Sequence, residues 1–210
     1  MAQAPGTTAE PGPVQRRRRG AALEDAIREA AFAELSTVGY HGFSVESVAA
    51  RAQTGKASIY RRWPSKAELV MDALLAELPE PADFGIPPAM ADDVTTADAL
   101  RMVARGIASV IDSPAGDAIR AVKFEALADP ELADLVDERF QAPRSAVLVQ
   151  LLERGVARGE VRPEAVCPLV AEVLPAVIVH RMVMQRERLS AADLEQLVEQ
   201  VMIPLVEVHR

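Results

Sequence analysis

The residues best suited to chemistry in this chain are cations and hydroxyls gathered between residues 56 and 66. The chain has three lysines, and two of them, Lys56 and Lys66, lie in this stretch. Arginine can grip a guanine edge with two hydrogen bonds, whereas lysine, serine and tyrosine mostly hold phosphates. The stretch is therefore suited to contact with nucleic acid. Its candidate DNA-contacting residues are Lys56, Ser58, Tyr60, Arg61, Arg62 and Lys66.

Two short helices with a tight break between them would position these side chains. Ser44 can cap a helix over 44–52, and a break at Gln53, Thr54 and Gly55 precedes a helix over 55–62. Trp63 precedes a proline and avoids the α conformation, which ends the second helix. Such a helix-turn-helix fits a major groove about 12 Å wide. We expect the second helix to carry its cations, Ser58 and Tyr60 on the outward face.

Further helices flank this pair. Apolar residues at three- and four-residue steps predict a helix from about residue 20 to Gly39, a residue suited to a left-handed helix end. The capping box from Ser65 to Glu68 predicts a connecting helix over 65–78. We therefore expect a flexible basic arm over 1–19, a three-helix DNA-binding domain over 20–66, and a ligand-binding and dimerisation domain over 79–210.

The C-terminal part is also predicted to be helical. A capping box from Thr95 to Asp98 opens a helix to about Asp112, and no stretch sustains the alternation of a strand, so the fold class is all-α. Further helices are expected over about 115–128, 130–141, 143–158, 163–187 and 190–207. Expected breaks or kinks fall at Pro114, Asp129-Pro130, Pro143, Gly159, Arg188–Ser190, Pro168, Pro175 and Pro204.

The stretch from Gly39 to Leu69, with its run from Lys56 through Trp63-Pro64-Ser65-Lys66, resembles the tetracycline-repressor (TetR) family of bacterial transcription regulators. The resemblance spans about residues 20–75. It implies an all-helical homodimer that binds double-stranded DNA through three N-terminal helices and a small inducer through its C-terminal domain. The family pattern implies that these residues face DNA: Ser44, Thr54, Lys56, Ser58, Tyr60, Arg62 and Lys66.

Two positions depart from the family pattern. Gln53 replaces the usual turn glycine, so we expect a turn whose backbone accepts a side chain. Gly55 replaces the usual serine and loses a hydroxyl for phosphate, although glycine is a tolerable cap. The basic arm is expected to add affinity by entering the minor groove, with a merely solvated run as the alternative. Its arginines are Arg16, Arg17, Arg18 and Arg19.

The charge distribution agrees with a polyanion-binding front. The whole chain carries −8, yet residues 1–66 hold ten Lys or Arg against six Asp or Glu, a local charge of +4. The single cysteine, Cys167, cannot form an intrachain disulfide, which favours a reducing compartment. No secretory signal or membrane span is evident, so a cytoplasmic location is expected.

The last two expected helices predict a subunit interface. Helix 163–187 is apolar nearly all round and helix 190–207 has one apolar stripe, so a second subunit is needed to cover them. A wholly internal helix is the alternative. The expected interface residues are Val170, Leu174, Val177, Ile178, Leu197, Val201 and Leu205.

A small-molecule effector is expected between the helices of 95–158 and helix 163–187. Aromatic residues are scarce beyond residue 66, which argues against a cage for a cation and favours an apolar effector. The candidate lining residues, each of which could be ordinary core, are Met102, Phe124, Phe140, Leu148, Leu152, His180 and Met184.

Together these features predict a ligand-responsive DNA-binding regulator. The simplest form is a repressor that binds a palindromic operator as a homodimer and is released by its effector. No metal spacing, nucleophile elbow or phosphate loop occurs, so we expect no cofactor, no metal and no enzymatic activity. A helical adaptor that uses the basic helices to contact a protein, or a small α-helical enzyme, are the weaker alternatives.

Overall fold

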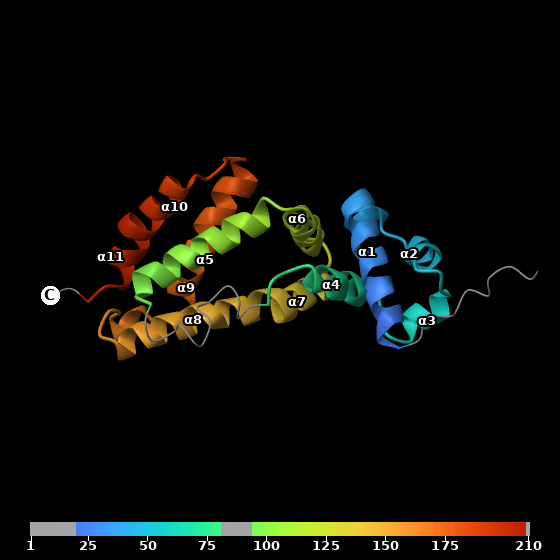
Figure 1. Cartoon of the computed structure of the whole chain (residues 1–210), viewed down its shortest axis with the longest axis horizontal. Helices are drawn as coiled ribbons and strands as arrows, with labels where there is room; N and C mark the ends of the chain where they lie inside the picture. The colour runs from blue at the N-terminus through green and yellow to red at the C-terminus, as the bar shows by residue number, and fades with distance from the viewer. Residues whose placement is uncertain (1–19, 81–93, 209–210) are drawn as a thin grey trace, which may run out of the picture.

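The computed structural model describes residues 20–80 and 94–208 of the chain. Every named element in these two ranges is helical, and the one extended pairing there is an isolated bridge between Val161 and Glu207. The predicted all-α fold is therefore confirmed. The molecule is elongated, with α1–α3 at one end and α10 and α11 at the other (Figure 1).

The N-terminal helices are α1 (Ala21–Gly42), α2 (Val45–Arg51) and α3 (Lys56–Tyr60), followed by α4 (Lys66–Ala76). The long helix is interrupted at Gly39, whose φ of 68° and ψ of −179° lie in a region open essentially to glycine alone. Ser44 caps α2, because its hydroxyl accepts a hydrogen bond from the backbone N–H of Ser47 at 3.4 Å. The predicted helix end and cap are thus confirmed.

The turn between α2 and α3 differs from the expectation. Gln53 does not adopt a backbone suited to a side chain; its φ of 54° keeps the left-handed conformation that glycine takes with ease. For a residue with a Cβ this costs roughly 1–2 kcal/mol. The N–H of Thr54 donates to the carbonyl of Ala49 at 2.9 Å, which helps hold the turn.

Only half of the predicted capping box forms at the start of α4. Ser65 accepts from the N–H of Glu68 at 3.2 Å, but the Glu68 carboxylate accepts from Arg139 at 2.8 Å instead of returning to the cap. At the start of α5 (Thr96–Ile111), Thr95 likewise accepts from the N–H of Asp98. The Asp98 carboxylate accepts from the Thr95 hydroxyl at 2.8 Å and from Arg101, whereas Glu68 is engaged by the distant Arg139.

The remaining helices follow the predicted order with two corrections. They are α6 (Pro114–Ala126), α7 (Pro130–Val136), α8 (Ala142–Ala157), α9 (Pro168–Val179), α10 (Ala191–Leu197) and α11 (Ile203–Val206). The predicted helix over 163–187 divides into a 3-10 turn, Pro163–Ala165, and α9. Pro168 is the first residue of α9, where its missing N–H costs nothing.

Pro143 does not break the chain into two helices, contrary to the prediction. A π-helical turn, η3 (Asp137–Gln141), joins α7 directly to α8, and the N–H of Ala142 donates five residues back to Asp137. The wider turn accommodates a residue that cannot donate a backbone bond. A second π-turn, η6 (Val198–Met202), stands at the same spacing before Pro204. A third, η5 (His180–Met184), extends α9.

Two hydrophobic cores divide the molecule. The first combines α1–α4 with buried residues of α6 and α7, including Val122 and Leu132. The second joins α5, α8 and α9 with the C-terminal helices around Leu152, Leu174 and Met202. α6 and α7 belong to the same core as α4. A displacement of α6 or α7 would therefore also displace the N-terminal helices that pack against them.

Candidate DNA-contacting surface and effector cavity

Three side chains of the α3 region point away from the protein. Lys56 and Arg61 are exposed, and Tyr60 is 49% exposed, whereas Ile59 between them is 1% exposed and anchors the helix in the first core. α3 stands in the outer end of the molecule (Figure 1). The helix therefore offers two cations and a phenol to a partner on this side.

Ser58 and Arg62 do not share this outward face, contrary to the prediction. Ser58 is 8% exposed, and its hydroxyl accepts from the Arg62 guanidinium at 3.2 Å. Arg62 also pairs with Glu24 at 2.9 Å, which ties the end of α3 to the start of α1. In this position Arg62 holds the helices together.

Lys56 and Lys66 are both engaged within the chain. Lys56 pairs with Glu46 of α2, and the hydrogen bond between them raises the pKa of Lys56 and lowers the pKa of Glu46. Lys66 stands over the Tyr40 ring, 4.3 Å from its centroid, and burial lowers the pKa of this lysine. The Lys56 ammonium keeps two further donors that a phosphate could use beside Glu46.

The other predicted DNA contacts are either half-buried or outside the described residues. Ser44 and Thr54 are half-buried at the start of α2 and in the turn. Arg16, Arg17, Arg18 and Arg19 lie outside the described residues.

A charged network behind α3 was missed by sequence reasoning. Asp72 of α4 accepts from Arg28 of α1 at 2.8 Å, from the Trp63 indole at 2.9 Å and from Arg139 of η3 at 3.3 Å. Burial raises the pKa of Asp72, but the hydrogen bonds from Arg28 and Trp63 outweigh it, so the pKa is lowered overall. Asp72 thus connects α1, the segment between α3 and α4, and η3 through one carboxylate.

A cavity of about 420 Å³ lies in the middle of the molecule, among α5, α6, α8 and α9. This volume is within the range of small-molecule sites. Of the predicted lining residues, Phe124, Phe140, Leu148 and Met184 line it. Met102, Leu152 and His180 do not: Leu152 is core at 1% exposure, and Met102 and His180 face solvent elsewhere.

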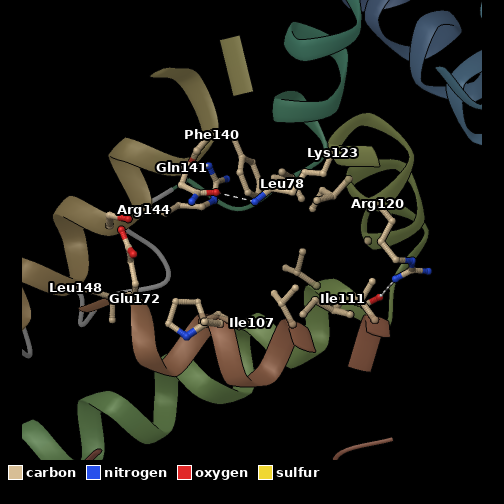
Figure 2. A pocket seen from close by; sticks show the side chains of 18 of the residues that line it. Leu78, Ile107, Ile111, Arg120, Lys123, Phe140, Gln141, Arg144, Leu148 and Glu172 are labelled. Atoms are coloured by element: carbon tan, nitrogen blue, oxygen red, sulfur yellow. Dashed lines mark hydrogen bonds between the residues drawn. The ribbon is translucent and has the colours of Figure 1, made fainter. Parts of the chain in front are cut away.

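Polar groups line one part of this largely apolar cavity, and none of them was predicted. Figure 2 shows Lys123 and Arg120 of α6, Gln141 of η3, Arg144 of α8 and Glu172 of α9 around it. The sequence carried no periodic signal for them, because charged residues on an amphipathic helix usually face water.

Burial within the single chain corrects part of the predicted subunit interface. Leu174, Ile178 and Leu197 are at most 7% exposed and belong to the second core, so they are not available to a second subunit. Val170, Val177 and Leu205 are half-buried and Val201 is 40% exposed. On α9, Leu169 is 73% exposed and was not predicted.

Two kinds of feature are absent from residues 20–80 and 94–208. No helix there is long and apolar enough to cross a bilayer. No group of three metal-ligating side chains occurs in the same ranges.

Comparison with known proteins places these features in a family context. Residues 27–73 match the family model "Bacterial regulatory proteins, tetR family", and residues 90–201 match "Tetracyclin repressor-like, C-terminal domain". An HTH-type transcriptional regulator of Mycobacterium tuberculosis is 31% identical over 170 residues, 81% of each chain. The "DNA-binding transcriptional repressor TetR" of Mycobacteroides abscessus is 31% identical over 190 residues, 90% of this chain and 96% of the relative.

The fold is similar to that of solved regulators. A TetR-family transcriptional regulator from Mesorhizobium loti superimposes with a TM-score of 0.71 at 21% sequence identity. The match covers 91% of this chain and 100% of that one.

Proposed function

The chain belongs to the TetR family of bacterial transcription regulators, and we propose that it binds a near-palindromic operator as a homodimer through α3. As a member of this family it is a ligand-responsive DNA-binding regulator and not an enzyme. The adaptor and enzyme alternatives are therefore not favoured. The relative from Mycobacteroides abscessus is named a repressor, which supports repression as the mode of action.

The observation that carries this proposal is the outward face of α3. Lys56, Tyr60 and Arg61 project from a helix whose opposite side is anchored by Ile59. Arginine in a major groove reads guanine, and lysine and tyrosine hold the flanking phosphates. We keep 20–66 as the DNA-binding unit, 65–78 as the connector and 79–210 as the ligand-binding and dimerisation domain. The arm at Arg16–Arg19 and the half-buried Ser44 and Thr54 remain proposed phosphate contacts.

The first prediction concerns Tyr60 and Arg61, which are exposed and form no ion pair with any of the described residues. An operator is selected from a random DNA pool with the wild-type protein, and affinities for it are measured by fluorescence anisotropy. We expect Arg61→Ala to cost about 1–3 kcal/mol if it reads a base, roughly a tenfold to hundredfold loss of affinity. Tyr60→Phe should weaken binding less and should act equally on all sequences, because it removes a phosphate contact.

Arg154→Ala is the matched control, since Arg154 is exposed on α8, a helix that packs in the second core and not against α3. Arg62 is unsuitable because its loss would open the Glu24 ion pair as well. Unchanged affinity in Arg61→Ala and Tyr60→Phe, or failure of the wild-type protein to enrich any sequence, would contradict the proposal.

The effector acts, in this proposal, on the spacing of two DNA-binding units. Phe140 and Gln141 of η3 line the cavity, while Arg139 of the same turn pairs with Glu68 and Asp72 of α4. A ligand that moves η3 therefore moves α4 and the helices packed on it. The ligand drives this change only to the extent that it binds the displaced form more tightly.

The dimer is proposed to form through α9 and the C-terminal helices. Val170, Val177, Val201 and Leu205 are the predicted interface residues that keep exposed surface in the single chain. Bacterial DNA lies in the cytoplasm, which is the location proposed for this regulator.

A further inference from the structure

We propose that the effector of the central cavity is an organic monocarboxylate with an apolar body, held at its charged end by Lys123. The inference rests on the proposed function, in which this cavity is the effector site. It adds a chemical class to that site: an acid whose carboxylate meets the ammonium of α6 and whose hydrocarbon fills the rest of the cavity.

Lys123 has the hydrogen-bonding capacity that such a ligand needs. Its ammonium donates to the side-chain oxygen of Gln141 at 2.6 Å and lies 5.3 Å from the centroid of the Phe140 ring (Figure 2). An ammonium has three donors, so two are left after the bond to Gln141. No carboxylate among the described residues forms an ion pair with it. Burial lowers the pKa of Lys123, with the field of Asp137 opposing it.

Two further cations, each with contacts of its own, are among the described residues that line the cavity. Arg120 is paired with Asp117 and donates to the carbonyl of Ile111 at 3.1 Å. Arg144 donates to the carbonyl of Phe140 at 3.0 Å and stacks 4.2 Å from the centroid of its ring. Glu172 is the one acidic side chain among the described lining residues.

These charges favour an anionic ligand group at Lys123. A carboxylate is attracted by this ammonium, whereas a second negative charge on the ligand would be repelled by Glu172. A cationic ligand would meet three positive side chains. Because charge-assisted hydrogen bonds are the strong ones in a desolvated site, a carboxylate gains most at Lys123.

The remainder of the cavity is suited to hydrocarbon. Ile107, Val110 and Ile111 of α5, together with Val179 of α9 and Val183 of η5, supply apolar lining. Burial of apolar surface there would supply most of the affinity, while the charged end fixes the orientation. The ligand is accordingly amphipathic.

The test measures direct binding to the full-length protein without DNA, by isothermal titration calorimetry. The probes are decanoate, decanol and decyltrimethylammonium, with naphthoate and naphthol as a second pair of different shape. We expect at least one carboxylate to bind tenfold or more tightly than its alcohol. Lys123→Met should lower the carboxylate affinity roughly tenfold to a hundredfold and leave the alcohol unchanged.

Lys123→Arg keeps the charge and should retain the preference, and Arg154→Met removes an exposed cation of α8 as a control. Thermal unfolding of each variant checks that it is folded. Equal binding of acid and alcohol, a preference for the trimethylammonium probe, an unaltered preference in Lys123→Met, or no binding of either carboxylate would overturn the inference. Operator binding is measured separately, so any of these results leaves the proposed DNA-binding function standing.

Discussion

At the scale of single residues, Asp72 joins more segments of the chain than any residue singled out from the sequence. Its carboxylate gathers donors from Arg28, Trp63 and Arg139, which belong to three separate segments. Arg28 and Arg139 are 44 and 67 residues away along the chain. No local pattern marks such a contact, whereas the caps at Ser44 and Ser65 depend only on neighbours three residues on and were predicted.

The stability of the protein should therefore depend on the charge of Asp72. We expect Asp72→Asn to lower the free energy of unfolding by about 1–3 kcal/mol at pH 7, because it weakens hydrogen bonds to charged partners at a partly buried site. The folded state lowers the pKa of Asp72 below the ordinary 3.8. Its contribution is thus fully present well above pH 3.8 and is lost as the pH falls through the folded-state pKa.

Urea unfolding of wild type and Asp72→Asn at pH 7 and pH 3 measures this contribution. The difference between them should shrink at pH 3. Asp134→Asn, at an exposed position on α7, is the control and should change little. A difference that is absent at pH 7, or that is the same at both pH values, would show that the network does not stabilise the fold in this way.

At the scale of elements, the π-turn η3 is the connection between cavity and DNA-binding unit. Sequence reasoning placed a break at Pro143 because proline cannot continue an ordinary α-helix. The structure keeps the helix continuous by widening the turn before the proline, and this places Phe140 and Gln141 in the cavity. The extra residue of a π-turn changes which side chains face the core, which periodicity alone cannot predict.

Arg139→Met should uncouple the two sites. In the wild type, a ligand that releases DNA must move α4, and Arg139 joins η3 to Glu68 and Asp72 of that helix. We expect the variant to bind ligand normally while the ligand weakens its operator binding several-fold less than in wild type. Operator titrations with and without ligand measure the coupling. The same ligand response in Arg139→Met and in Arg154→Met would exclude this route.

The inward orientation of Ser58 was also not predicted, because the sequence pattern alone does not determine which side chains of α3 face the core. α3 is five residues long, and its buried face extends from Ile59 to Ser58, whereas Tyr60, about 100° to the other side of Ile59, is exposed. The sequence of so short a helix does not indicate on which side of Ile59 the buried face extends. The DNA-contacting role of α3 stays a prediction, whereas the outward directions expected for Ser58 and Arg62 were wrong.

At the scale of the whole molecule, apolar patterning identified buried helices but not what buries them. Leu174, Ile178 and Leu197 are covered by the second core of their own chain. A buried stripe looks alike in sequence whether its partner lies in the same chain or in another. The exposed Leu169 of α9 is the better guide to where a second copy would pack.

The central claim is that two copies of α3 enter one operator together. Hydroxyl-radical footprinting of the selected operator with wild-type protein tests it most directly. Two symmetric protected segments about 34–36 Å apart, or a multiple of one helical turn, are expected on the same face of the duplex. Both should disappear together in the Arg61→Ala, Tyr60→Phe double variant. A single protected segment, or protection that persists in that variant, would contradict the account.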